Sequence, residues 1–299
     1  MVSKKYKTQK DSKTGLLRII ALKDFSDVKK GDKGGLIEKE ENLSQEGNCW
    51  VFCNAQVFGS AQVFGSAQVF GNARVCDNAQ VYGEASISGD AKVYYKAQVF
   101  GSAQVYDNAQ VYGEASISGN ARVCDNAQVC GEAQVYGEAS VSGNAWVYGK
   151  AQVFGETQVD DNAQVLGSAQ VYGEASVSGN AWVYDKAQVF GNAQVCGNAR
   201  VCDNAQVYGE ASISGNAWVY DKAQVFGSSQ VYDNAQVFGS ANVYDNAQVF
   251  GKARICGDAE INRAVEIIDI TIHSKNVDLS KADKYCKDMP LIHKLYGKP

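Results

Sequence analysis

Histidine is the first residue type in this sequence that could do chemistry, because a neutral imidazole is the commonest general base in proteins. The chain has two histidines only, His273 and His293, and both lie near its C-terminal end. A general base must lie within hydrogen-bond reach of the group that it activates. Catalysis by histidine in the central part of the chain is therefore excluded, and we expect both histidines to be ordinary surface or cap residues.

Cysteine is the second candidate, with nine copies in the chain. Six of them occupy one position of a six-residue repeat that elsewhere holds Phe, Tyr or Ser: Cys76, Cys124, Cys130, Cys196, Cys202 and Cys256. No C-x-x-C pair and no histidine lies near these six, so neither a zinc site nor a disulfide framework is indicated. We interpret them as small apolar substitutes and expect no metal and no cofactor.

The six-residue repeat itself must position every one of these side chains. Val or Ile recurs at every sixth residue from Val51 to Ile261 without insertion or deletion. From Val57 onward a small residue stands two positions before each of them, and from Ala55 to Ala259 it is Ala except at Thr157 and Ser229. Because neighbouring side chains of a strand point to opposite sides, Ala and Val should face inward, and Gln and the aromatic residue outward. Gly or Asp followed by Asn, Ser, Glu or Lys then forms the corner, since these residues tolerate tight or left-handed backbone.

A longer repeat indicates how many hexads complete one coil. Three nearly identical segments begin at Glu138, Glu174 and Glu210, 36 residues apart. Duplication in whole coils keeps every face aligned, so this spacing favours coils of 18 residues with three hexads each. The sequence predicts an all-β parallel β-solenoid of about 12 triangular coils over residues 48–262, with short caps at 1–47 and 263–299.

The corners of such coils would carry polar ladders. One edge is nearly pure Asn, and stacked amides can hydrogen-bond to one another along the axis. A second edge holds Glu84, Glu138, Glu156, Glu174 and Glu210. The middle three would lie about 5 Å apart on successive coils, and three such carboxylates could hold a hard cation. We favour the simpler interpretation, a solvated acidic edge.

The faces carry the most informative pattern. Residues eighteen apart would stack, which predicts an aromatic ladder interrupted at Ser118, with a Gln ladder beside it, and a second face with a Trp on every other coil. An outward aromatic stripe of this length exceeds what monomers usually expose, and we predict that it is a binding face. The binding face comprises Phe64, Tyr82, Phe100, Tyr136, Phe154, Tyr172, Phe190, Tyr208, Phe226, Tyr244, Trp146, Trp182 and Trp218. The remaining face has Ser-x-Ser gaps at Ser86, Ser140, Ser176 and Ser212.

The two ends are expected to close the solenoid, whose terminal edges would otherwise invite end-to-end polymerisation. We predict an apolar strand at 16–22, a turn-rich segment at 31–35, a last strand at 264–272 and a short helix at 279–296. Residues 1–47 are too few and too charged to bury a core alone. Their apolar positions should cover the first coil: Leu16, Leu17, Ile19, Ile20, Leu36 and Ile37.

Charge is distributed unevenly along the chain. Residues 1–33 carry ten Lys or Arg against four Asp, whereas residues 34–262 carry 11 basic and 24 acidic side chains. An acidic repeat region argues against nucleic acid bound along it, because duplex binding depends on Lys and Arg neutralising phosphates. The Lys-rich start could contact an anionic partner, although we favour a solvated, partly disordered tail.

Targeting signals are not evident. No run approaches the roughly 20 apolar residues of a membrane span, and the N-terminus lacks an apolar stretch long enough for a signal peptide. We therefore expect a cytoplasmic protein without a membrane partner.

The sequence resembles a known family in its leader and its repeats. The leader ALKDFSDVKKGDKGGLIEKEENLSQEGNCWV, residues 21–51, and the N-A-Q-V-Y-G hexads resemble the YdcK-like hexapeptide-repeat proteins of bacteria and their phages, which are often labelled acyltransferases. The resemblance covers roughly residues 16–261. It implies a left-handed β-helix, and this handedness is not determined by the repeat spacing alone.

Three functions from different classes remain open. The favoured one is a non-enzymatic structural or binding scaffold whose aromatic and Gln faces mediate self-association, giving a homo-oligomer, or bind a protein partner. The second is an inhibitor from a phage or other mobile element that blocks a host protein. The third is a hexapeptide-repeat acyltransferase, which would need a general base and an ejected loop for the acyl donor, and the uninterrupted hexads offer neither.

Overall fold

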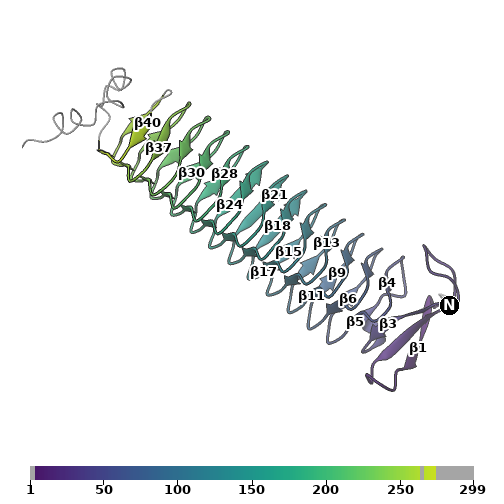
Figure 1. Ribbon diagram of the computed structural model, residues 1–299. Helices are drawn as coiled ribbons and strands as arrows, with labels where there is room; N and C mark the ends of the chain where they lie inside the picture. The colour runs from purple at the N-terminus through teal and green to yellow at the C-terminus, as the bar shows by residue number, and fades with distance from the viewer. Residues whose placement is uncertain (1–3, 263–265, 274–299) are drawn as a thin grey trace, which may run out of the picture. The chain divides into compact units, whose positions relative to one another are not determined.

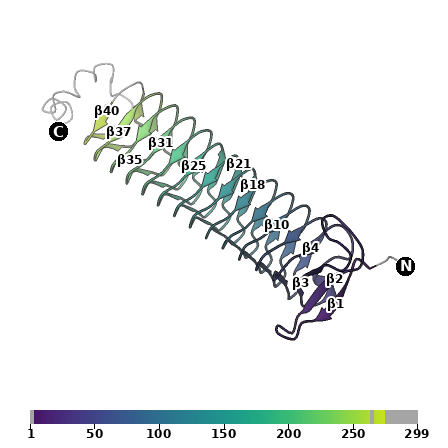
Figure 2. The ribbon, with the colours of Figure 1, turned by 45° about the vertical axis from the view of Figure 1, so that its right-hand side comes forward.

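The computed structural model describes residues 4–262 and 266–273 and divides the chain into two compact units, Met1–Asp161 and Asn162–Pro299. Within each unit, short strands follow one another every six residues, and each pairs in parallel with strands eighteen residues away, as in Lys92↔Gln110 and Gln188↔Gln206. Figures 1 and 2 show these strands as successive turns. The fold is a single-stranded, all-β parallel β-solenoid, as the hexad spacing predicted, and the described residues contain no α-helix. The left-handed sense stays a prediction from the resemblance.

The interior consists of the Ala and Val positions, which are fully buried throughout the repeat, as predicted. Two polar residues replace Ala there. Ser229 donates its hydroxyl to the carbonyl oxygen of Phe226 at 2.8 Å and to that of Val243 at 3.3 Å. The hydroxyl of Thr157 is buried and has no hydrogen-bond partner. The core is thin, so its stability comes from many similar contacts between neighbouring turns.

Unit 1 has three faces, which we name by their distinctive residues. The tryptophan face contains β5 (Gln56–Val57), β8 (Arg74–Val75), β11 (Lys92–Val93), β14 (Gln110–Val111), β17 (Gln128–Val129) and β20 (Trp146–Val147). The ladder face contains β6 (Gln62–Val63), β9 (Gln80–Val81), β12 (Gln98–Val99), β15 (Ser116–Ile117), β18 (Gln134–Gly137) and β21 (Gln152–Gly155). The serine face contains β4 (Trp50–Val51), β7 (Gln68–Val69), β10 (Ser86–Ile87), β13 (Gln104–Val105), β16 (Arg122–Val123), β19 (Ser140–Val141) and β22 (Gln158–Val159).

Unit 2 repeats the three faces. Its tryptophan face contains β23 (Gln164–Val165), β26 (Trp182–Val183), β29 (Arg200–Val201), β32 (Trp218–Val219), β35 (Gln236–Val237), β38 (Arg254–Ile255) and β41 (Thr271–Ile272). Its ladder face contains β24 (Gln170–Gly173), β27 (Gln188–Val189), β30 (Gln206–Val207), β33 (Gln224–Val225), β36 (Asn242–Val243) and β39 (Glu260–Ile261). Its serine face contains β25 (Ser176–Val177), β28 (Gln194–Val195), β31 (Ser212–Ile213), β34 (Gln230–Val231), β37 (Gln248–Phe250) and β40 (Glu266–Ile268).

The corners adopt left-handed backbone, which explains why Gly and Asp alternate there. Asp125, for example, has a φ of 56°. Its carboxylate accepts a hydrogen bond of 3.0 Å from the backbone N–H of Gly143, the corner residue one turn further on. Asp221 and Asp233 accept from Gly239 and Gly251 in the same way. An Asp corner thus offsets its unfavourable φ with a bond that Gly cannot make.

The N-terminal cap is a small antiparallel sheet that continues into the solenoid. Strands β1 (Tyr6–Lys10), β2 (Leu17–Ala21) and β3 (Lys33–Ile37) are consecutive neighbours, and β3 pairs in parallel with β5. Of the six apolar residues predicted to cover the first coil, Ile19, Leu36 and Ile37 are buried, and Leu16, Leu17 and Ile20 are half-buried.

Two expectations for this cap were wrong. The segment 31–35 is not a continuous turn, because Lys33–Ile37 is strand β3. A Cβ at Gly34 would clash with the carbonyl oxygen of Val51, and one at Gly35 with that of Ala55. These two glycines therefore permit close packing of β3 rather than a turn.

The Lys-rich start is also not a solvated tail over residues 4–10. Lys5 is buried, and its ammonium donates to the carbonyl oxygens of Cys49 at 2.9 Å and Glu46 at 3.2 Å. Burial lowers the pKa of Lys5 and raises that of Tyr6. The Tyr6 hydroxyl donates to the carbonyl oxygen of Leu43 at 2.7 Å.

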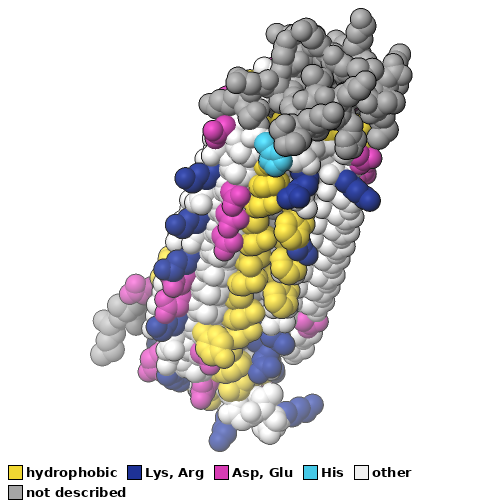
Figure 3. Space-filling model, turned by 90° about the vertical axis from the view of Figure 1, so that its left-hand side faces the viewer, with side chains coloured by type: hydrophobic (Ala, Val, Ile, Leu, Met, Phe, Trp, Pro, Cys, Tyr) yellow, Lys and Arg dark blue, Asp and Glu magenta, His cyan; other side chains and the backbone are white. Residues whose placement is uncertain are grey.

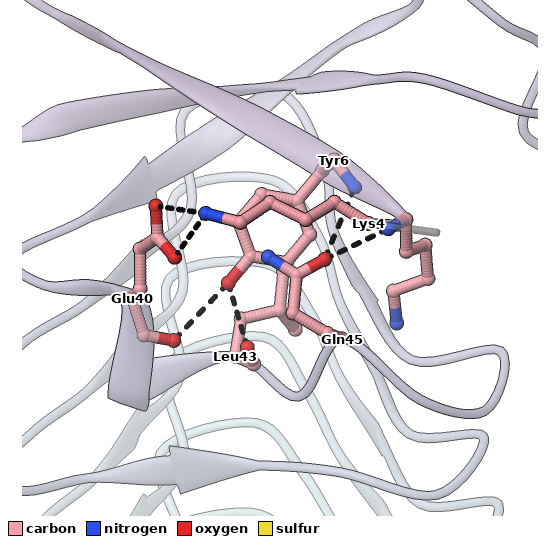
Figure 4. Close-up of polar contacts among 6 residues, drawn as sticks. Lys4, Tyr6, Glu40, Leu43 and Gln45 are labelled. Carbon is pink, nitrogen blue, oxygen red and sulfur yellow. Dashed lines mark hydrogen bonds and ion pairs between the residues drawn. The ribbon is translucent and has the colours of Figure 1, made fainter. Parts of the chain in front are cut away.

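Figure 4 shows how this start is fastened to the short 3-10 helix η1 (Glu40–Asn42) and the residues after it. The Lys4 ammonium pairs with the Glu40 carboxylate at 3.0 Å. The side-chain oxygen of Gln45 accepts from the backbone N–H of Lys5 at 2.8 Å and from that of Tyr6 at 3.3 Å. These bonds fix a segment whose composition suggested disorder.

The C-terminal expectation requires one correction. Residues 264–272 do not form one strand: β40 (Glu266–Ile268) and β41 (Thr271–Ile272) are separate and lie on different faces. Asp269 between them has a φ of 54°, the left-handed backbone of a corner. The predicted helix at 279–296 lies outside the described residues.

Candidate binding surfaces

The ladder face carries the predicted stack of aromatic rings. In unit 1 the ring centroids of Phe64 and Tyr82 lie 4.8 Å apart at an interplanar angle of 4°. In unit 2 the stack runs without interruption from Tyr172 to Tyr244, with centroid separations of 4.8–4.9 Å. Because the strand spacing of a sheet falls within the centroid separations of offset-stacked rings, each ring covers part of the face of the next. These side chains are consequently half-buried rather than fully exposed.

The Gln ladder beside the rings is also formed. Gln188 donates its amide to Gln170 at 3.2 Å, and Gln206 donates to Gln188 at 3.1 Å. The Tyr208 hydroxyl donates to the side-chain oxygen of Gln224 at 3.3 Å. Polar groups of the ladder face thus bond to one another along the axis, which favours a structural role for this face.

The tryptophan face is more open. The Trp side chains stand at the position that Gln usually occupies, and Trp146, Trp182 and Trp218 are 44%, 38% and 37% exposed. In unit 2 the guanidinium of Arg200 lies between two of them, 5.4 Å from the Trp182 ring centroid and 4.9 Å from that of Trp218. The indole faces are therefore covered by a cation, and the ring edges remain accessible.

Tyrosines hold the indoles in place from the side. Tyr184 meets Trp182 edge to face at 6.5 Å, and Tyr220 meets Trp218 at 6.2 Å. In unit 1, Tyr148 meets Trp146 in the same way at 6.3 Å. We call the group Trp182, Arg200, Trp218, Tyr184 and Tyr220 the Trp–Arg patch of unit 2.

Charge on the tryptophan face is basic. Arg74 lies over the ring of Phe58 at 5.1 Å, and Arg254 over that of Phe238 at 5.3 Å. Figure 3 shows a row of hydrophobic side chains with Lys and Arg as well as Asp and Glu beside it. The adjoining corner carries both charges: Lys96 pairs with Glu114 at 2.8 Å, and the hydrogen bond between them raises the pKa of Lys96 and lowers that of Glu114.

Sequence reasoning missed Arg200, although the signal was present. Arg200 lies eighteen residues after Trp182 and eighteen before Trp218, so the predicted coil length already placed it between them. The structure brings these three together, whereas Trp146 belongs to unit 1.

The candidate catalytic residues are arranged as follows. The Nδ1 atom of His273 lies 2.8 Å from the sulfur of Cys256, so the expectation that no histidine lies near the six repeat cysteines was wrong. Cys256 is only 2% exposed, and burial raises the pKa of its thiol, which opposes a thiolate nucleophile. His293 lies outside the described residues. The eight described cysteines are free thiols.

The corner ladders follow the sequence prediction. Asn162, Asn180 and Asn198 are linked side chain to side chain at 3.1 Å per step, and Asn126 donates to Asn144 at the same distance. Across residues 4–262 and 266–273, no group of three or more His, Cys, Asp or Glu side chains is arranged to hold a metal ion. In the same residues no helix is long and apolar enough to cross a membrane.

Comparison with known proteins points to one kind of repeat. Four segments match the family model of the YdcK β-solenoid repeat: residues 67–83, 115–131, 133–149 and 193–209. The chain is also 50% identical over 48 residues to a protein of Escherichia coli strain K12 named "Uncharacterized acetyltransferase YdcK". That similarity covers 16% of this chain and 15% of the relative's length. With the hexad spacing and the observed solenoid, these matches show that the chain contains YdcK-like β-solenoid repeats.

Proposed function

We propose that this protein is a non-enzymatic binding scaffold that associates with a second copy of itself through the tryptophan face. The observation that carries the proposal is the Trp–Arg patch of unit 2. Trp, Tyr and Arg are the residues most enriched at the energetic centres of protein interfaces. A row of them held in place by mutual contacts loses little side-chain entropy on binding.

The ladder face supports the proposal by contrast. Its rings already contact one another, and its amides already hydrogen-bond to one another. Burying the ladder face against a partner would therefore contribute less binding free energy than burying the tryptophan face. The tryptophan face holds the large indole edges that stay accessible. Closed pairing of two copies would hide such a surface without open-ended growth. The free thiols agree with the reducing cytoplasm, which we propose as the compartment.

The magnitude of the effect follows from the exposed fractions. A Trp side chain buries up to about 250 Å², so the exposed third of each indole amounts to roughly 90 Å². At about 25 cal/mol per Å², covering it contributes about 2 kcal/mol per indole. Each indole removed should therefore weaken association about 30-fold, and because a pair of identical copies holds each position twice, a single substitution should weaken it roughly 1,000-fold.

The test replaces both indoles by the residue that the repeat itself uses at this position. Gln occupies it at Gln164 and Gln236 on the same face, so Trp182→Gln with Trp218→Gln should leave the solenoid intact. Sedimentation equilibrium over a concentration series should show dimers for the unmodified chain and monomers for the double variant, with Gln164→Ala as the matched control. If the chain is monomeric at all concentrations but binds one host protein through the same indoles, self-association is wrong and the inhibitor function is supported.

Acyl transfer is the second candidate, and the printed name of the E. coli relative favours it. The described residues offer one Cys–His contact, Cys256 with His273, and its thiol is buried. Calorimetric titration with coenzyme A tests this function. Saturable binding that His273→Ala abolishes would support acyl transfer and count against the scaffold.

A further inference from the structure

A polar hollow of about 610 Å³ lies on the serine face of unit 1. It spans β13, β16, β19 and β22, which pair in register so that Gln104, Arg122, Ser140 and Gln158 form one row. The hollow arises where Ser140 and Ser142 replace the long Gln and aromatic side chains that most turns carry. Their neighbours Arg122 and Gln158 lie on strands two spacings apart, roughly 9–10 Å.

The wall of the hollow is acidic. Glu138 and Glu156, corner residues of two successive turns, line one side. Asp160 lines the hollow next to Ser142, and its Oδ1 atom is buried without a hydrogen-bond partner. Burial, followed by the neighbouring charge of Asp161, raises the pKa of Asp160. A buried carboxylate oxygen without a donor is costly unless a ligand supplies one.

Arg122 provides the opposite charge and is not neutralised by these acids. Its guanidinium makes no ion pair with any residue in the described part of unit 1. The lining of the hollow thus offers hydrogen-bond donors for an anionic group as well as carboxylates for a cationic one. Ser102, Asn120 and the two serines add neutral donors and acceptors between them.

We infer that this hollow binds a small zwitterion, with an ammonium group held by acidic residues of the lining and a carboxylate on Arg122. Charge-assisted hydrogen bonds of both kinds are the stronger ones in proteins. A dication would be repelled by Arg122, and an anion by the three acids. The inference is independent of the proposed self-association, which uses the tryptophan face.

Three probes of equal chain length separate these possibilities. Calorimetric titration of the full chain with γ-aminobutyrate, putrescine and butyrate should show binding of γ-aminobutyrate at least tenfold tighter than that of the dication or the anion. Added salt should weaken it, because the hollow is open to solvent. Equal binding of putrescine and γ-aminobutyrate, or binding of neither, would overturn the assignment.

Variants locate the binding in the hollow. Glu138→Gln with Asp160→Asn should reduce γ-aminobutyrate affinity at least tenfold, and Arg122→Gln should remove the preference over putrescine. Ser142→Tyr introduces the residue found at the same register in Tyr106 and should fill the hollow and abolish binding. Should that variant not fold, Ser140→Gln, the repeat's usual residue, serves instead. Glu210→Gln on a corner of unit 2 is the control and should change nothing; binding that survives filling of the hollow would contradict the site.

Discussion

The Asp corners allow a local test of how this solenoid is stabilised. Asp125 combines a φ of 56° with a carboxylate that accepts the Gly143 N–H at 3.0 Å. Left-handed backbone costs a non-glycine residue about 1–2 kcal/mol, and an exposed hydrogen bond of this kind contributes about 1 kcal/mol. The two terms nearly cancel, so the sequence can use Asp or Gly at corners without a large change in stability.

Substitution separates the two terms. Asp125→Gly loses the hydrogen bond but relieves the strain, and its free energy of unfolding should stay within about 0.5 kcal/mol of the parent chain once the greater freedom of unfolded Gly is included. Asp125→Ala loses the bond and keeps the strain, so it should be about 1 kcal/mol less stable. Asp107 is the matched control, because its φ is 57° and its carboxylate accepts no hydrogen bond within the described residues. Asp107→Ala should therefore cost much less than Asp125→Ala.

Two measurements test these predictions. Urea unfolding followed by circular dichroism gives the change in stability, and amide hydrogen exchange at Gly143 reports the bond directly. Exchange at Gly143 should accelerate in both Asp125 variants, whereas global stability should fall only in the Ala variant. Equal destabilisation by Gly and Ala, or unchanged exchange at Gly143, would refute the account of the corners.

Three further predictions concern the ladder, the thiols and the cap. Phe190→Ser with Tyr208→Ser should lower the unfolding temperature and leave association unchanged, since these rings mainly contact one another. Loss of association in this variant would indicate that the ladder face is the interface. Burial raises the pKa of Cys76 and of Cys202 to about 11 from an ordinary value of 9.0. The stability that the two thiols contribute is fully present below pH 9.0 and is lost as the pH rises through about 11, because the thiols of the unfolded chain ionise first. Cys→Ala at both positions should flatten the fall in unfolding free energy between these two pH values. An unchanged pH dependence of stability would contradict this prediction. Deleting residues 1–47 should uncover the edge of the first turn and give fibres or aggregates on electron micrographs, whereas a well-behaved product of the expected size would show that no cap is needed.

The regular part of the fold was predictable because its signal is strictly periodic. Val and Ala at fixed positions of every hexad indicated the buried core, and the 36-residue spacing indicated three strands per turn. The aromatic side chains were predicted to point outward and to stack along the axis, and the rings do stack. How far stacking buries each ring depends on the spacing between turns rather than on any single residue.

The ends were less predictable because their composition conflicts with their structure. Lys5 follows Lys4 in a charged segment, which favours solvent, yet three backbone carbonyl oxygens and the sulfur of Cys49 accept its hydrogen bonds. Gly34 and Gly35 suggested a turn, although close packing required them in a strand. In the sequence, the hollow beside Asp160 is evident only as a Ser-x-Ser gap. Its depth depends on the long side chains that surround the two serines.

The central claim is that the chain associates through its exposed indoles, and hydroxyl-radical footprinting across a concentration series tests it most directly. As the protein passes from dilute to concentrated solution, oxidation of Trp182 and Trp218 should fall several-fold, while oxidation of Tyr172 and Phe190 on the ladder face stays constant. Protection of the ladder rings with unchanged oxidation of both indoles would contradict the claim.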